Sequence, residues 1–178
     1  MSVPAEEEVE QLTAVADLFA ALLLREVDRD LIESLEASGA DVALRSFNVS
    51  LPAATEVDAL DALAAEYFEV FVKPLEGPPM IQSLAEGDAF EGPPADAMRA
   101  IAEACGVDFD PVAARGAPVD HLGAQLSLWA SLRRRDAEAA SAFADRHLRW
   151  ATRHLERRRD ASFYGQLSGT VADFIGLL

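Results

Sequence analysis

The sequence is poor in residues that mark several classes of protein. Its 178 residues include one cysteine and one lysine. Cys105 has no partner for an internal disulfide, so the cysteine content does not point to an oxidising compartment. The longest strongly apolar run, residues 18–24, is far shorter than the roughly 20 residues of a membrane span. The first ten residues carry four Glu and no Lys or Arg, the reverse of a signal peptide. These absences predict a cytoplasmic protein without a membrane span.

Positive charge is also scarce. Fifteen Lys and Arg stand against 31 Asp and Glu, a formal net charge of −16. Residues 1–120 hold 25 acidic and 6 basic side chains, whereas residues 121–178 hold 6 acidic and 9 basic ones. Binding to nucleic acid is disfavoured, because phosphate contacts need clustered Lys and Arg. The acidic first two thirds fit two interpretations, solubility or attraction to a basic partner.

The chain lacks recognisable catalytic motifs. It has no G-x-S-x-G nucleophile motif and no glycine-rich phosphate loop. His147 and His154 share a helix face but lie seven residues apart, on the order of 10 Å at about 1.5 Å per residue, which is too far for two ligands of one ion. The sequence therefore predicts no metal site, no cofactor and no enzymatic activity.

Apolar residues recur every three or four positions along most of the chain, and no stretch alternates with period two. This pattern predicts an all-α fold: a single domain over residues 1–178, a bundle of about seven to nine helices. The fourth helix is expected to be capped by Thr55. The expected helices cover residues 5–25, 28–39, 41–47, 55–72, 95–105, 120–133, 136–158 and 160–178.

A long Pro/Gly-rich loop is expected between the fourth helix and residue 95. Residues 74–94 contain five prolines and three glycines, with a possible helical turn at 81–86. Loops of this length inside a compact domain are more often binding elements than idle connections. This loop is therefore the first candidate for a functional segment.

Several strings, taken in order, are similar to those of a known family. Residues 67–71 (Tyr-Phe-Glu-Val-Phe) and 77–83 (Gly-Pro-Pro-Met-Ile-Gln-Ser) resemble the Y-x-x-x-F helix end and following loop of the redox-enzyme maturation chaperones, the TorD/DmsD/NarJ group. Residues 118–121 (Pro-Val-Asp-His) resemble the later part of its E-P-x-D-H motif, with Ala117 in place of the glutamate. The strings at 147–150 and 163–164 resemble its last two helices.

The resemblance implies a cytoplasmic chaperone that binds the twin-arginine leader or N-terminal segment of a molybdopterin oxidoreductase, assists cofactor insertion and delays export. The alternative is a permanent structural or regulatory subunit of a metalloenzyme complex. Helix exchange between protomers makes a homodimer possible.

The candidate peptide-binding site lies between the end of the fourth helix, the loop after it and the start of the helix at residue 120. Tyr67 and Phe71 would line an apolar groove or else be ordinary core aromatics. Asp120 would meet a client cation or else be an early-turn acid at its helix dipole, and His121 would bond loop or peptide backbone or else be partly buried. The full set is Tyr67, Phe71, Pro79, Met80, Ser83, Pro118, Asp120 and His121.

Overall fold

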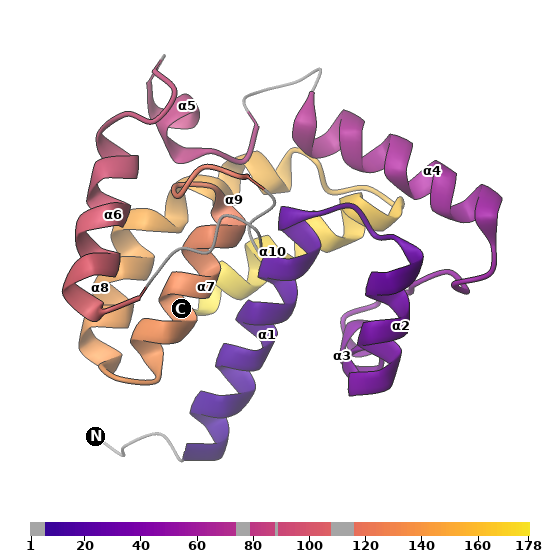
Figure 1. The fold of residues 1–178 in the computed structure, drawn as a ribbon, viewed down its shortest axis with the longest axis horizontal. Helices are drawn as coiled ribbons and strands as arrows, with labels where there is room; N and C mark the ends of the chain where they lie inside the picture. Colours follow the sequence, from indigo (N-terminus) through magenta and orange to yellow (C-terminus); the bar gives the residue numbers. More distant parts are fainter. Residues whose placement is uncertain (1–5, 74–78, 88, 108–115) are drawn as a thin grey trace. The chain divides into compact units, whose positions relative to one another are not determined.

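The computed structural model describes residues 6–73, 79–87, 89–107 and 116–178. Within these residues it contains ten α-helices, one π-helical segment and no β-strand, so the all-α prediction is confirmed (Figure 1). None of the helices in this part of the chain is long and apolar enough to cross a membrane. The chain divides into two compact units, each assembled from separate stretches of sequence. The single domain over residues 1–178 stays a prediction.

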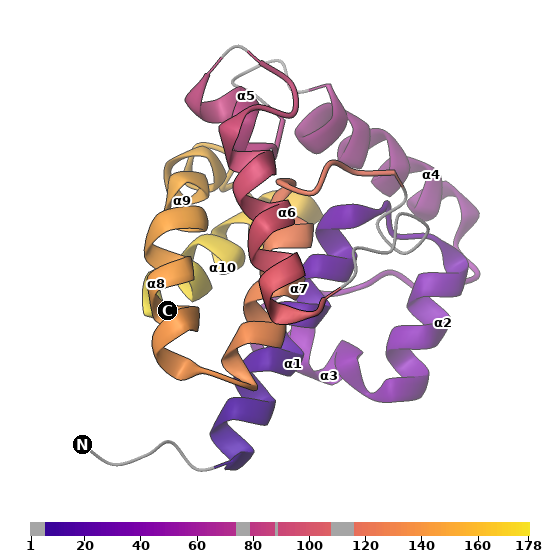
Figure 2. The same cartoon turned by 60° about the vertical axis from the view of Figure 1, so that its left-hand side comes forward.

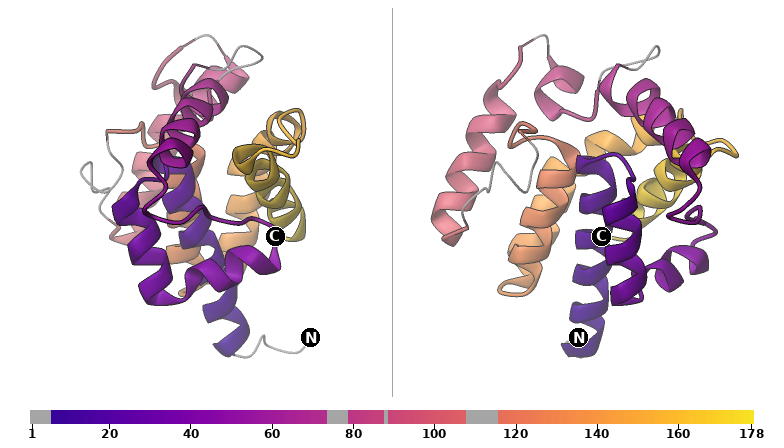
Figure 3. Two further views of the ribbon diagram at one scale, coloured as in Figure 1. Left: turned by 90° about the vertical axis from the view of Figure 1, so that its right-hand side faces the viewer. Right: turned by 45° about the vertical axis from the view of Figure 1, so that its right-hand side comes forward.

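Unit 1 comprises residues 1–24, 80–151 and 178. Its helices are α1 (Glu6–Leu24), α5 (Gln82–Glu86), α6 (Pro93–Cys105), α7 (Leu122–Arg133) and α8 (Ala137–His147). Helix α1 packs along α7, and α8 folds back on α7 (Figure 3). A Cβ at Gly123 would lie 2.6 Å from Leu24 Cγ and 3.0 Å from the Ala20 carbonyl oxygen, so glycine is what lets α1 and α7 approach so closely.

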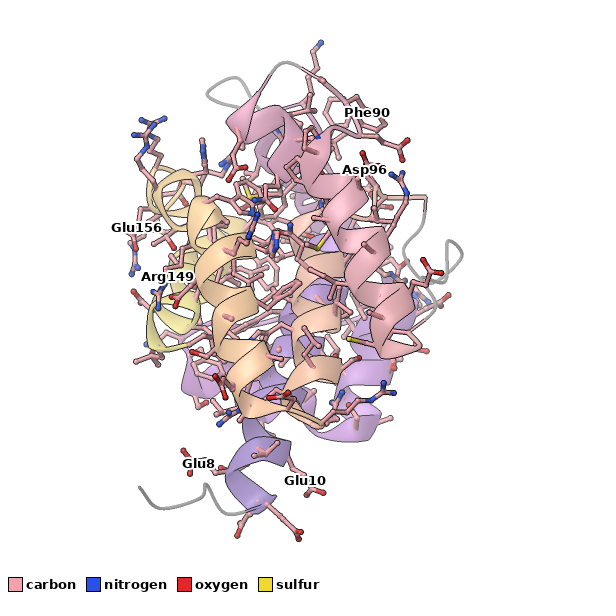
Figure 4. All side chains as sticks on the ribbon, turned by 90° about the vertical axis from the view of Figure 1, so that its left-hand side faces the viewer. Glu8, Glu10, Phe90, Asp96, Arg149 and Glu156 are labelled. Carbon is pink, nitrogen blue, oxygen red and sulfur yellow. The ribbon has the colours of Figure 1, made fainter. Side chains whose placement is uncertain are left out.

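The first turns of α1 carry the acidic side chains that the sequence places at its N-terminal dipole. Glu6, Glu7 and Glu8 lie in the first turn. Glu8 and the following Glu10 extend from the end of the helix, away from the other helices of unit 1 (Figure 4). These residues are exposed, and the buried side of α1 begins at Thr13 and Ala16.

Unit 2 comprises residues 25–79 and 152–177. It contains α2 (Arg29–Ser38), α3 (Ala40–Ser46), α4 (Val57–Tyr67), the π-helical segment η1 (Phe68–Val72) and α10 (Phe163–Leu177). Asp28 caps α2 by accepting a hydrogen bond from Leu31 N at 2.8 Å, and Gly39 ends it in the left-handed region with φ 75°. Both ends agree with the helix that the sequence predicts over residues 28–39.

Helix α4 starts two residues later than predicted. It begins at Val57, and Glu56 precedes it without a side-chain capping bond, so Thr55 is not the cap. The helix continues to Val72 as predicted, but its last turn is π-helical, with Lys73 N donating to Phe68 O at 2.8 Å.

The predicted helix over residues 136–158 is broken at Leu148. The predicted start is confirmed, with Asp136 as the N-cap of α8, but α8 ends at His147 and α9 runs separately from Arg149 to Glu156. The indole Nε1 of Trp150 donates to the His147 carbonyl at 3.0 Å, and Ala151 N turns back to Leu148 O instead. This side chain takes the carbonyl that a continuous helix would use. The break accounts for a tenth helix beyond the expected seven to nine.

The predicted Pro/Gly-rich loop contains the expected helical turn. Helix α5 occupies residues 82–86 and leads into α6, which starts with Pro93 in its first turn (Figure 2). Helix α6 ends as expected before Gly106, with φ 61°. The loop residues 74–78 and 88 lie outside the described part of the chain.

Candidate functional site

Two loops of unit 1 that are distant in sequence pair through their backbones. Gln82 N donates to Asp120 O at 3.1 Å, and Leu122 N donates to Met80 O at 2.8 Å. These two bonds form an isolated antiparallel bridge between Ile81 and His121. The start of α5 is thereby fixed to the start of α7, and four of the predicted site residues are brought together.

Asp120 strengthens this pairing with its side chain. The carboxylate is completely buried, and its Oδ2 accepts hydrogen bonds from Ser83 N at 2.8 Å and Ser83 Oγ at 2.5 Å. Ser83 Oγ in turn accepts from Gly92 N at 2.9 Å, which ties in the residue just before α6. Bonds to a charged acceptor are roughly twice as strong as neutral ones, so Asp120 firmly holds Ser83 and, through it, Gly92.

The second carboxylate oxygen of Asp120 is chemically unusual. Oδ1 is buried and has no hydrogen-bond partner among the described residues. An unsatisfied buried acceptor costs about 1–3 kcal/mol, and such groups call for an explanation. This atom is an acceptor that a donor from outside the chain could satisfy.

His121 is the N-cap of α7. Its Nδ1 accepts from Gly123 N at 3.1 Å, which assigns the proton of the neutral ring to Nε2. Burial lowers the pKa of His121 to about 4, although the Asp120 charge opposes part of that shift. The imidazole is therefore uncharged at neutral pH and cannot serve as a cation for Asp120.

The remaining unit 1 candidates differ in exposure. Met80 is fully buried and belongs to the core, whereas Pro118 is partly exposed. Ala117, which stands where the resembling family has glutamate, is also partly exposed. Pro79, which ends the first stretch of unit 2, is partly exposed as well.

Tyr67 and Phe71 form an aromatic cluster with Tyr164 inside unit 2. The three ring centroids lie 5.4–5.5 Å apart in edge-to-face arrangements, which aromatic pairs prefer. Burial, with a smaller contribution from Glu26, raises the pKa of Tyr67 to about 12, so its hydroxyl is never ionised near neutrality. Tyr67 and Phe71 thus pack against α10, and whether they share one groove with Asp120 stays a prediction.

Tyr164 anchors that cluster, and the sequence interpretation gave it no site role. Its hydroxyl accepts from Val27 N at 2.9 Å, and its own backbone N donates to Glu66 Oε1 at 2.6 Å. Burial raises its pKa well above the usual range. A tyrosine in the first turn of a strongly apolar helix was the available signal, but the inward face expected from the sequence did not include it.

A chain of amide hydrogen bonds in unit 1 was also missed. Trp150 Nε1 donates to Gln125 Oε1 at 3.1 Å, Gln125 Nε2 donates to Gln82 Oε1 at 2.6 Å, and Gln82 Nε2 donates to Glu86 Oε1 at 3.0 Å. Gln125 and Gln82 are buried. Gln125 is the one amide side chain in α7, with large apolar residues around it, which was the sequence signal for a buried polar contact.

The described residues contain no group of three or more His, Cys, Asp or Glu side chains placed to hold a metal ion. His147 has a buried Nδ1 without a hydrogen-bond partner in this part of the chain. Its pKa is lowered by burial first and by Arg146 second, against a smaller opposing effect of Glu86.

The site around Asp120 consists of one buried carboxylate, the Ser83 hydroxyl and the neutral His121 ring. These groups suit the binding of backbone and other peptide groups.

The fold is all-helical, and its candidate site is built on a buried carboxylate, Asp120, that links the starts of α5 and α7. The profile of the nitrate reductase delta subunit family matches residues 33–168, and the chain belongs to that family. The family consists of NarJ/TorD-type chaperones that act in molybdoenzyme maturation, as the sequence resemblance indicated. No curated protein and no solved structure matches the chain.

Proposed function

We propose that this protein is a non-catalytic cytoplasmic chaperone that binds the twin-arginine leader or N-terminal segment of a molybdopterin oxidoreductase. It would hold the client while the cofactor is inserted and so delay export. The observation that carries the proposal is the family match over residues 33–168, which includes all eight candidate site residues.

The chemistry of such a client suits the charge of the chain. A twin-arginine leader presents two guanidinium groups followed by an apolar stretch, and residues 1–120 hold 25 acidic against 6 basic side chains. Exposed ion pairs contribute only about 0.2–1 kcal/mol each, so the acidic surface would mainly speed and orient the encounter. Apolar burial, at roughly 25 cal/mol per Å², would supply most of the affinity.

Asp120 has two proposed roles that experiment can separate. Through Oδ2 it holds Ser83 and the start of α6, and through the unpaired Oδ1 it would accept a donor from a client guanidinium. The carboxylate is fully buried, so the second role requires the loop to move aside. Pro79, Met80, Pro118 and His121 would shape the surroundings of that opening. Within unit 2, Tyr67 and Phe71 would offer apolar surface to the client's apolar stretch.

The test is titration of the full chain with a fluorescent synthetic twin-arginine leader, taken from a molybdoenzyme encoded beside this protein. We expect saturable binding that is weakened tenfold or more by Asp120→Asn. Ser83→Ala is the matched variant, because it removes a loop bond without removing the charge. Equal losses in both variants would leave only the loop-holding role, and no binding of the leader by the unaltered chain would contradict the proposed function.

The alternative, a permanent subunit, draws support from the description of the family as a subunit of nitrate reductase. Affinity purification of the mature oxidoreductase distinguishes the two. A chaperone is absent from the cofactor-loaded, active enzyme and present on the cofactor-free form. A permanent subunit is recovered with both forms in constant proportion.

A further inference from the structure

Helix α4 and the π-helical segment η1 carry a row of exposed residues along one side. The spacing between successive members is three or four residues, so they lie on one side of the helix. Val57 is 56% exposed, Phe68 50% and Val72 53%. The row is formed by Val57, Asp61, Ala65, Phe68 and Val72, and we call it the outer row.

The inner and outer sides of this segment are built from the same apolar string. Phe71 is 3% exposed and packs on Tyr164, while its neighbours Phe68 and Val72 point outward. Four of the five residues of η1 are large and apolar, which would fit a buried helix end, but only Phe71 among them is buried. Single exposed apolar residues are ordinary, whereas an aligned row with no charge between residues 65, 68 and 72 is a recognisable contact surface.

Acidic side chains border the outer row. Asp61 lies within it, and Asp58 and Glu69 lie beside it, all exposed. Lys73 is the exposed cation at its far end. Arg158 also reaches this segment, but its Nε–H donates to the Val70 backbone oxygen at 3.1 Å. The outer row is thus apolar apart from Asp61, and further negative charge lies along its flank.

We infer that the outer row is a docking surface for an amphipathic, basic helix of the client protein. The inference rests on the proposed function and deepens it, because it names the chemistry of the client segment: apolar residues at three- and four-residue spacing, with Arg or Lys beside them. Fifteen residues separate the ends of the row, about 22 Å at 1.5 Å per residue, which matches roughly four turns of a partner helix.

The negative charge beside the outer row also disfavours a second copy of this chain as the partner that binds there. A two-fold contact would place the same patch on both partners, so each copy would bring Asp58, Asp61 and Glu69 to the interface. Like charges brought together in this way oppose association. A basic helix pairs with the same three carboxylates and covers the same apolar line.

The probe for the test is a synthetic 18-residue helical peptide with Leu along one face and Arg along the other, labelled with fluorescein. We expect the full chain to bind it, and the double variant F68S/V72S to bind at least tenfold more weakly, a difference of about 1.4 kcal/mol. The matched control is V42S/F90S, which removes one Val and one Phe that are 59% and 61% exposed elsewhere. Phe90 lies close to the start of α6 (Figure 4).

The charge component has its own pair of variants. D58N/E69Q is expected to reduce affinity several-fold at 50 mM salt and to have little effect at 500 mM, because salt screens exposed charges. The control D30N/E33Q neutralises two exposed acids on α2 and should change affinity by less than twofold. A peptide with Glu in place of Arg should not bind.

Three outcomes would overturn the inference: no binding of the basic peptide by the unaltered chain, equal binding by F68S/V72S, or a drop in the mass of the free protein in that variant. The last, seen by light scattering, would assign the outer row to a homodimer. None of these depends on the leader titration, so a chain that binds the leader but not through the outer row keeps the proposed function.

Discussion

Helices α4 and α7 are alike in length and apolar content, but α7 is mostly buried and α4 is mostly not. Helix α4 has eight hydrophobic residues in 11, and α7 has seven in 12. Nine residues of α7 are buried, however, and only Leu63 of α4 is. Apolar content therefore does not determine burial in this chain.

The difference lies in charge placement and packing partners. Helix α7 carries no acidic residue and one basic residue, Arg133 in its last turn, and it packs against α1, α6 and α8. Helix α4 has Asp58, Asp61 and Glu66 spread around it and packs against α10. A charged side chain on each exposed turn keeps α4 at the surface, and α7 is free to become a core helix.

The largest expected effect concerns the core of α7. Leu126 is completely buried, so Leu126→Ala removes packing and leaves a cavity. We expect the free energy of unfolding to fall by about 2–5 kcal/mol, measured by urea denaturation followed by circular dichroism. A loss below about 1 kcal/mol would mean that α7 is not the packing centre of unit 1.

The cap of α7 should make stability depend on pH. The pKa of His121 is about 4 in the folded chain against an ordinary value of 6.5, so the unfolded chain binds more protons below pH 6.5. Stability from this group is full above about pH 6.5 and is lost as pH falls toward 4, by up to about 3 kcal/mol. His121→Asn keeps an N-cap acceptor and removes the titration, so urea midpoints between pH 7.5 and 4.5 should fall less steeply. His147 and His154, whose pKa values are also lowered by burial first, contribute to the slope that remains.

A smaller effect is expected at the inner side of α4. Tyr164→Phe keeps the ring that contacts Tyr67 and Phe71 but leaves the buried Val27 N without its acceptor. We expect a loss of about 1–2 kcal/mol in urea denaturation. Faster hydrogen exchange at the Val27 amide would locate the change. An unchanged exchange rate there would show that the tyrosine hydroxyl is not its protecting partner.

The sequence predicted the helices well where local signals act alone. The boundaries expected near residues 28, 39, 105 and 136 are the observed ones, because Asp28, Gly39, Gly106 and Asp136 each act on backbone groups within a few residues. The break at Leu148 was not predictable in this way. It depends on Trp150 taking the His147 carbonyl while also donating to Gln125, a residue 25 positions away.

The candidate site was predicted in part for a similar reason. The strings around Ser83 and Asp120 identified the residues, but only the fold shows that the Asp120 carboxylate is buried and bonded across 37 residues to Ser83. The aromatic string at 67–71 identified apolar surface without indicating which side faces outward. Phe68 and Val72 were missed because that orientation depends on the π turn and on contact with Tyr164.

The smallest expected effect lies on the outer row of α4. Val57 is more than half exposed at the first helical position, so Val57→Ala removes little buried area and replaces a β-branched residue with the best helix former. We expect the free energy of unfolding to change by less than about 0.5 kcal/mol in urea denaturation, in contrast to Leu126→Ala. A loss above about 1.5 kcal/mol that grows with protein concentration would show that the outer row is covered by a second copy in solution. A small change in the free energy of unfolding at every protein concentration would mean that no second copy covers the outer row. Helix α4 would then keep an exposed apolar side for a client, whereas α7 is buried in the core.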